Sequence, residues 1–396
     1  MKRRDPNPVF GALGTTIFTV MSALAAKHGA INLGQGFPDE DGPLAIREAA
    51  AKALREGPNQ YPPMQGLIEL RRAVAAHSHR FYDLDFDPES EIIVTSGATE
   101  ALTDCMLGLV GPGDEAILIE PNYDSYPPIL KAAGARIRPL RLEAPKFRID
   151  EAALAAVFSE RTKLIMVNSP LNPIGRVFDR AELELIAQFL KRYDAFAVCD
   201  EVYEHLVFDG REHIPLISLP GMRERTVRVG SAGKMFSLTG WKIGWIEGPA
   251  RLILPIMKAH QFNTFTTSPA LQLGVAYALE HEMDYALGNA RELQGKRDLI
   301  AKALAGAGFE VLGCEGTYFI TTSIRNLTNE PDLEFCKRLT REAGITAIPL
   351  SVFYGEDGPT DLVRFAFCKK REVIEESARR LSAHLPGPTT NGASRG

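Results

Sequence analysis

Short apolar runs alternate with helical patterns through the middle of the chain. The runs predict buried β-strands at residues 92–94, 116–119, 164–167, 196–199, 227–229 and 243–246. Apolar residues at helical spacing predict helices between them, over about 98–110, 123–133, 151–158 and 180–193. Asp179 and Glu182 form a capping-box-like pair before the last of these helices. Strands that alternate with helices are typical of a mainly parallel sheet covered by helices, so the predicted fold class is α/β.

The segments on either side of this region follow other patterns. Helices are predicted over about 17–24, 44–54 and 67–81, with a glycine- and proline-rich turn at 34–38. After a helical stretch over 269–306, a strand at 318–320, a helix at 332–343 and a strand at 363–367 predict a smaller α+β domain. The polar end of the chain, from residue 385, is predicted to be disordered.

Composition excludes several classes of protein. The 396 residues suffice for two domains, and a net charge of −5 without a basic stripe argues against nucleic-acid binding. The five scattered cysteines form no C-x-x-C pair, which argues against a disulfide framework and a zinc site. No apolar run reaches the roughly 20 residues of a membrane span. We therefore expect a soluble, cytoplasmic protein without a metal site, and we expect His77 and His79 at the surface.

One glycine-rich stretch joins Lys234 to a hydroxyl, Ser231, and to a second cation, Lys242. A lysine attacks carbonyl groups only after it loses a proton, and burial near another cation favours that loss. Gly230 and Gly233 would let the backbone approach a phosphate beside the amine. This combination indicates an aldehyde that carries a phosphate, as pyridoxal phosphate does. The alternative is an ordinary surface loop.

Other polar residues follow the predicted strands. Residues 97–99 turn from strand into helix, which can bind an anion or be only a turn. Asp200 ends an apolar strand, where it could keep a pyridine nitrogen protonated or could only cap a helix. Tyr203 could donate a hydrogen bond to the phenolic oxygen of the ring, or it could be an ordinary half-buried tyrosine. The 168–173 loop is rich in turn formers, and either of its asparagines could only hold the loop. Arg364 lies inside an apolar strand and needs an anion, either a ligand carboxylate or an internal acid.

Several of these motifs occur in one order along the chain. They are Asn172-Pro173, Asp200-x-x-Tyr203, Ser231-x-x-Lys234 and Arg364. With this set the chain resembles the class I pyridoxal-phosphate-dependent aminotransferases of the aspartate-aminotransferase fold, from about residue 8 to 382. Four segments make it most similar to the branch of kynurenine, glutamine and methionine aminotransferases: 32–38, 59–61, 199–203 and 231–245.

The resemblance implies an architecture and an assembly. Residues 43–288 would form a large cofactor-binding domain with a mainly parallel seven-stranded sheet, and 289–384 a small C-terminal domain that residues 1–42 join. Residues 385–396 would be the disordered tail. The family likeness also implies a homodimer with active sites at the subunit interface.

The resemblance further implies a role for each site residue. Lys234 would form the Schiff base with pyridoxal 5'-phosphate, and Asp200 would pair with the pyridine nitrogen. The other expected cofactor contacts are Gly97, Ala98, Thr99, Ser231 and Lys242 at the phosphate, Asn172 and Tyr203 at the phenolic oxygen, Tyr123 on the ring, and Tyr61 reaching over from the neighbouring subunit. The expected substrate contacts are Arg364, Gly36 and Asn172 at the carboxylate, with Phe18, Tyr126, Phe262 and Phe265 as candidate pocket walls. Many class I members have arginine at the position of Lys242, and lysine supplies charge without a bidentate fork.

The implied activity is a ping-pong transfer of an amino group from an L-amino acid to a 2-oxo acid, with the freed Lys234 amine as general base. Residues 258–268 contain no arginine for a second carboxylate. We therefore expect neutral, long or aromatic donors such as methionine, glutamine, phenylalanine or kynurenine. The alternatives are a cysteine-S-conjugate β-lyase and an N-succinyldiaminopimelate aminotransferase. A non-enzymatic regulatory module that binds the cofactor is a further alternative, but it would have lost Lys234, Asp200 or Arg364, or gained a helix-turn-helix domain.

Overall fold

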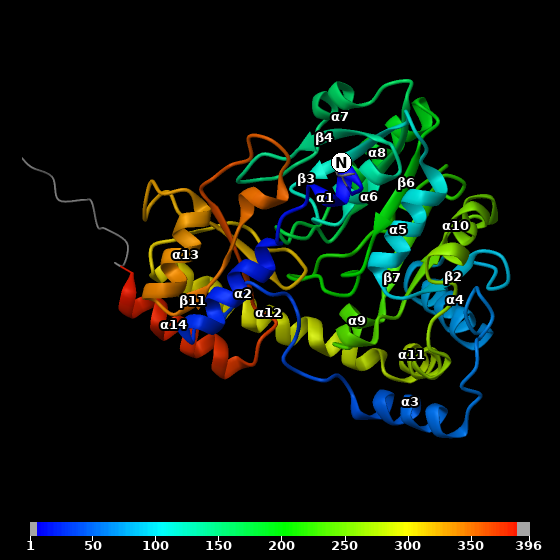
Figure 1. The fold of residues 1–396 in the computed structure, drawn as a ribbon, viewed down its shortest axis with the longest axis horizontal. Helices are drawn as coiled ribbons and strands as arrows, with labels where there is room; N and C mark the ends of the chain where they lie inside the picture. Colours follow the sequence, from blue (N-terminus) through cyan, green and yellow to red (C-terminus); the bar gives the residue numbers. More distant parts are fainter. Residues whose placement is uncertain (1–5, 386–396) are drawn as a thin grey trace, which may run out of the picture.

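The computed structural model describes residues 6–385, and a seven-stranded sheet forms its larger part (Figure 1). The strand order is β2-β8-β7-β6-β5-β3-β4. The strands are β2 (Ile92–Thr95), β3 (Glu115–Glu120), β4 (Arg136–Arg141), β5 (Thr162–Asn168), β6 (Phe196–Asp200), β7 (Thr226–Ser231) and β8 (Gly244–Glu247). Only β8 runs antiparallel to its neighbours, β2 and β7. The predicted α/β class and mainly parallel sheet are confirmed.

The sequence pattern did not predict β4, which is an edge strand. Its sequence carries three arginines and a proline, and Leu140 is its one buried side chain. Charged residues and proline are common on edge strands, where they hinder pairing with another chain. Such a strand has no apolar run from which to predict it.

Helices follow the strands and cover the sheet (Figure 1). They are α5 (Ala98–Leu109), α6 (Tyr126–Ala132), α7 (Glu151–Val157), α8 (Arg180–Arg192), α9 (Ala232–Met235) and α10 (Ala250–Asn263). The predicted capping box is present, because the Asp179 side chain accepts from the Glu182 amide and the Glu182 side chain accepts from the Asp179 amide. The sequence pattern did not predict α10, since Pro255 lies inside it and interrupts the helical pattern.

Six further helices lie among residues 6–306. They are α1 (Pro8–Gly11), α2 (Ile17–His28), α3 (Leu44–Glu56), α4 (Ile68–Tyr82), α11 (Pro269–His281) and α12 (Met283–Gly306). Both α3 and α4 pack on α11. The stretch over 269–306, predicted as continuous, is two helices that meet at Glu282. Short 3₁₀ turns occupy Leu216–Ser218, Thr239–Trp241 and Leu350–Phe353.

A second, antiparallel sheet forms the smaller part, with the order β12-β13-β10-β9. Its strands are β9 (Glu310–Val311), β10 (Phe319–Ser323), β12 (Ile348–Pro349) and β13 (Leu362–Ala366), with helices α13 (Asp332–Glu342) and α14 (Arg371–His384). Strand β1 (Ile31–Asn32) pairs with β11 (Ile345–Thr346), which supports the proposal that residues 1–42 join the small domain. The proposed tail lies outside the described residues from 386 onward. Among residues 6–385, no helix is long and apolar enough to cross a membrane.

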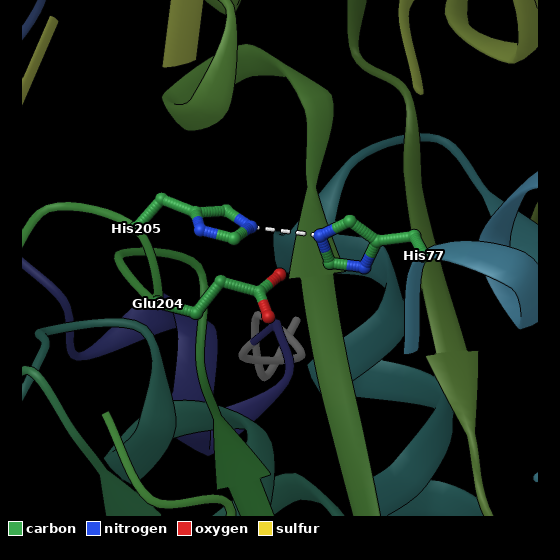
Figure 2. A group of neighbouring side chains, drawn as sticks. All are labelled: His77, Glu204 and His205. Atoms are coloured by element: carbon green, nitrogen blue, oxygen red, sulfur yellow. Dashed lines mark hydrogen bonds between the residues drawn. The ribbon is translucent and has the colours of Figure 1, made fainter. Parts of the chain in front are cut away.

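The prediction that His77 lies at the surface is wrong. Its ring is buried, and its Nε2 lies 2.7 Å from Nε2 of His205 (Figure 2). Burial lowers the pKa of His77 to about 3, so the ring is neutral at pH 7. Two neutral rings at this distance share one hydrogen bond, in which one ring donates and the other accepts. The Glu204 carboxylate beside them (Figure 2) pairs with Arg228 at 2.7 Å.

Arg228, in strand β7, is the centre of a buried ion cluster. Its guanidinium pairs with Glu201 and Glu204 at 2.7 Å and with Glu247 at 3.3 Å, and all four side chains are almost fully buried. Burial raises the pKa of Glu247 to about 7, which offsets part of the excess negative charge. Arg228 is therefore the cation on which the two other carboxylates depend.

Replacing Arg228 by methionine should destabilise the protein by about 3–5 kcal/mol, because Glu201 and Glu204 would stay buried without their cation. Urea unfolding followed by circular dichroism measures the change. The matched control is Arg180→Met, because Arg180 forms an exposed ion pair with Glu184 at 3.9 Å. This replacement should lower the free energy of unfolding by less than about 1 kcal/mol. Equal unfolding midpoints for the two variants would contradict this account of the cluster.

Candidate active site

A cavity of about 320 Å³ lies beyond the carboxyl ends of β6 and β7. Open α/β sheets bind their ligands at this edge. The structure brings to this one cavity most of the residues proposed from the sequence. They are Phe18, Gly36, Gly97, Ala98, Thr99, Tyr123, Asn172, Asp200, Tyr203, Ser231, Lys234, Lys242 and Arg364.

Four other proposed residues do not line the cavity. Tyr61 is 83% exposed and packs edge-on against Phe265, with ring centroids 5.6 Å apart. Phe262 is 85% exposed. Tyr126 is buried, and its hydroxyl donates to Asp200 Oδ2. Tyr126 therefore supports Asp200 instead of forming a pocket wall.

Lys234 lies in the single turn of α9, directly after β7, and its tip opens into the cavity. The protein surrounds the rest of the side chain, and this burial lowers the pKa of Lys234 to about 8. About a tenth of the amine is then unprotonated at pH 7, far more than for a free lysine. The Nζ atom donates a hydrogen bond to the hydroxyl of Tyr318 at 2.8 Å.

The glycines around Lys234 serve mainly protein packing. A Cβ on Gly230 would lie 2.3 Å from the Trp245 ring, so this glycine makes room for the indole. A Cβ on Gly233 would lie 3.0 Å from Thr239 Cα, although Gly233 also lines the cavity. Gly230 does not line the cavity, and the expectation that it lets the backbone approach a phosphate stays a prediction.

Asp200 ends β6 and is 5% exposed, with its carboxylate at the cavity. Burial raises its pKa, while the Tyr126 hydroxyl and the Val202 amide stabilise the charged form. Asn168 donates to the Asp200 carbonyl at 2.8 Å and accepts from the Asn172 amide at 2.8 Å. Asn168 thus holds the loop, while the Asn172 side chain faces the cavity. A buried carboxylate of this kind gains from a protonated ring nitrogen beside it.

The start of α5 forms an anion seat. Gly97 has a positive φ of 78°, and a Cβ there would lie 3.2 Å from the Lys242 Nζ atom. The free amides of the first helical turn, the Thr99 and Ser231 hydroxyls and the Lys242 ammonium all border this space. A phosphate is the kind of group that such a seat binds.

Arg364 forms a second anion seat in the cavity. The side chain is 1% exposed, donates to Asn172 Oδ1 and to the Gly34 carbonyl at 3.0 Å each, and lies 3.9 Å from the centroid of the Phe319 ring. Within the described residues it forms no ion pair, and its Nε has no hydrogen-bond partner. Burial lowers its pKa to about 10, so it stays charged at neutral pH. Asp124 acts on Arg364 only through its charge at longer range and forms no ion pair with it. The guanidinium thus keeps donors free, which favours a ligand carboxylate over an internal ion pair.

Sequence reasoning missed Tyr318, which it placed only in a strand. This tyrosine contacts Lys234 Nζ, and its hydroxyl also donates to the Gly36 carbonyl at 2.7 Å. A Cβ on Gly36 would lie 2.3 Å from the Phe319 ring, so this glycine lets its segment approach β10. The contacts of Tyr318 with Lys234 and Gly36 join residues 84 and 282 positions apart, and no local pattern signals them.

Comparison with known families identifies this chain. The model of the family "Aminotransferase class I and II" matches residues 28–381. The chain belongs to this family. A probable N-succinyldiaminopimelate aminotransferase of Mycobacterium tuberculosis is 44% identical over 95% of this chain and 98% of its own length. A methionine aminotransferase of Escherichia coli strain K12 is 42% identical over 95% of this chain and 97% of its own length. The solved structure of the N-succinyldiaminopimelate aminotransferase from M. tuberculosis superposes with a TM-score of 0.93, with 43% identity over 96% of this chain and all of that one.

The predicted family, the transaminase class and the aspartate-aminotransferase fold are therefore confirmed, and this aminotransferase uses pyridoxal phosphate. The cavity residues fit that cofactor. The anion seat at α5 suits its phosphate, Asp200 suits its pyridine nitrogen, and Lys234 is an amine of lowered pKa for its aldehyde. The free space beside Gly97, which a Cβ would fill, is part of this fit.

Proposed function

We propose that this aminotransferase takes neutral, long or aromatic L-amino acids as donors, such as methionine, glutamine, phenylalanine or kynurenine. The observation that carries the proposal is the charge of the cavity wall. Of the described residues that line the cavity, the cationic ones are Lys234, Lys242 and Arg364. If these serve the aldehyde, the phosphate and the substrate carboxylate, none is left for a second carboxylate. The apolar rings of Phe18, Phe37 and Phe319 also line the cavity, and those of Phe18 and Phe319 lie against the Arg364 guanidinium.

We assign the residue roles on the same geometry. Arg364 and the Asn172 side chain bind the α-carboxylate, and Tyr123 and Tyr203 hold the cofactor ring. The bound cofactor supplies an electron sink that acidifies the substrate α-carbon, and Asp200 sustains it by keeping the pyridine nitrogen protonated. Lys234 Nζ would take the proton from the substrate α-carbon and hold it for return, the amino group would stay with the cofactor, and water would supply the oxygen of the released 2-oxo acid. A second 2-oxo acid reverses these steps.

The assembly proposed is a homodimer with the active sites at its interface. Tyr61, Phe262 and Phe265 are large aromatic side chains left 41–85% exposed on one face, which supports burial against a second copy. In that assembly Tyr61 would reach the neighbour's cofactor phosphate. All five cysteines are free and buried, which suits the cytoplasmic location that we propose.

A donor panel tests the substrate proposal. Methionine, glutamine, phenylalanine and kynurenine should give kcat/KM values at least about tenfold above that of aspartate, because a second carboxylate would be buried without a cation, which costs more than 1.4 kcal/mol. Coupled assays of the 2-oxo acid products measure each value. Aspartate as the best donor would overturn the proposal.

N-succinyldiaminopimelate aminotransferase is the second candidate, favoured by the 44% identity to the mycobacterial relative. Its substrate carries further carboxylates, so N-succinyl-LL-diaminopimelate belongs in the same panel. A kcat/KM for it tenfold above that for methionine would select this function. The cysteine-S-conjugate β-lyase alternative predicts pyruvate release from a cysteine conjugate without any 2-oxo acid.

A further inference from the structure

The hydroxyl of Tyr318 links the amine of Lys234 to the backbone of the N-terminal segment. It accepts from Lys234 Nζ at 2.8 Å and donates to the Gly36 carbonyl at 2.7 Å. A tyrosine hydroxyl has one hydrogen, and the carbonyl, which can only accept, uses it. Lys234 must therefore be the donor in the other bond. Toward Lys234, the Tyr318 hydroxyl acts only as an acceptor.

The surrounding packing fixes this hydroxyl. Tyr318 is 1% exposed, and its ring meets the Tyr203 ring edge-on, with centroids 5.1 Å apart. A Cβ on Gly36 would lie 3.0 Å from the Tyr318 ring, so a glycine lets the carbonyl approach this closely. The hydroxyl thus has little freedom to turn away from the amine.

The other groups around Lys234 do not replace this acceptor. Asp200 contributes negative charge, whereas Lys242 and Arg364 contribute positive charge that disfavours the ammonium. Burial raises the pKa of the nearby Cys368 thiol to about 12, so it is neutral. The centroid of the Tyr203 ring lies 5.7 Å from Nζ, a cation–π distance and not a hydrogen bond. Within the described residues, Tyr318 supplies the hydrogen bond recorded for this amine.

We infer that Tyr318 is a further catalytic residue of this aminotransferase. Its hydroxyl orients Lys234 Nζ and stabilises the ammonium that forms when this amine takes the proton from the substrate α-carbon. The proton moves from the α-carbon to Nζ. Tyr318 stays protonated throughout, and its hydroxyl keeps donating its hydrogen bond to the Gly36 carbonyl. The inference rests on the proposed role of Lys234 as the proton-transferring amine.

The test measures the protonation of Lys234 in the full-length protein freed of cofactor. Competitive labelling with a trace of acetic anhydride across a pH series, with the Lys234 peptide quantified by mass spectrometry, gives the pH at which labelling is half-maximal. In Tyr318→Phe the ammonium loses its acceptor, so this midpoint should fall by about one pH unit. Tyr285→Phe is the matched control, because it removes a hydrogen-bonded tyrosine hydroxyl that does not line the cavity and is bonded to Ser237 at 3.0 Å. It should leave the midpoint unchanged.

Turnover gives a second readout. Tyr318→Phe should lower kcat about tenfold with KM nearly constant, and should enlarge the rate difference between α-hydrogen and α-deuterium donors. A labelling midpoint that does not move in Tyr318→Phe would overturn the inference, even if kcat falls. Borohydride trapping of the cofactor in the wild-type protein reports on Lys234 separately. Trapping at another lysine would refute the role of Lys234 itself, whereas trapping at Lys234 with an unmoved midpoint would refute only the role of Tyr318.

Discussion

Replacing Lys234 by alanine should lower kcat roughly 10⁴- to 10⁶-fold, the loss typical of removing a nucleophile that also transfers protons. The reason is geometric. The other lysine at the cavity, Lys242, borders the phosphate seat beside Gly97. No other lysine among the described residues lines the cavity, so no side chain of this chain can replace the lost amine. Turnover with the best donor of the panel measures the effect.

The matched control for this variant is Lys302→Ala, which removes an exposed lysine from α12. It should leave kcat unchanged within about twofold, since surface substitutions rarely matter. Methylamine in the buffer should restore part of the activity of Lys234→Ala, because it can enter the vacated space and act as a base. A Lys234→Ala enzyme that kept more than a hundredth of the wild-type kcat would contradict the assignment.

The second large effect is expected for Asp200→Asn, with a fall in kcat of roughly 10²- to 10⁴-fold. The amide has nearly the shape of the carboxylate, and the Tyr126 hydroxyl can still donate to its oxygen, so the fold should persist. What is lost is the negative charge that keeps the pyridine nitrogen protonated. Stopped-flow measurement of a single half-reaction isolates this chemical step from substrate binding.

Tyr126→Phe is the control for Asp200, because it removes the hydroxyl partner and keeps the carboxylate. Its kcat should fall by no more than about tenfold, the effect of one hydrogen bond. If Asp200→Asn kept a kcat within threefold of the wild type, Asp200 would not be the partner of the ring nitrogen.

The sequence predicts the central sheet well because its strands are buried. Strands β5 and β6 each contain a continuous apolar run, 164–167 and 196–199, which is typical of a parallel sheet covered on both faces. Strand β4 was not predicted, because it is charged, lies at the edge of the sheet and has few buried side chains. Where a helix contains a proline, as α10 does at Pro255, the pattern is interrupted although the helix continues.

The candidate site divides in the same way. Asp200 and Ser231 were predictable because each ends an apolar strand, and the carboxyl ends of such strands meet at one edge. Tyr318 was not, and neither was the buried position of His77 outside the site, because their partners lie 84 and 128 positions away in the sequence. Tertiary packing alone creates these contacts, and neither residue type signals them locally.

The most direct test of the account is the site of attachment of the cofactor. Sodium borohydride reduction of the wild-type enzyme with bound pyridoxal phosphate, followed by proteolysis and mass spectrometry, shows which lysine carries the reduced cofactor. The account predicts that the peptide with Lys234 carries it and that the peptide with Lys242 does not. Cofactor on Lys242 or on another lysine, with Lys234 unmodified, would contradict it.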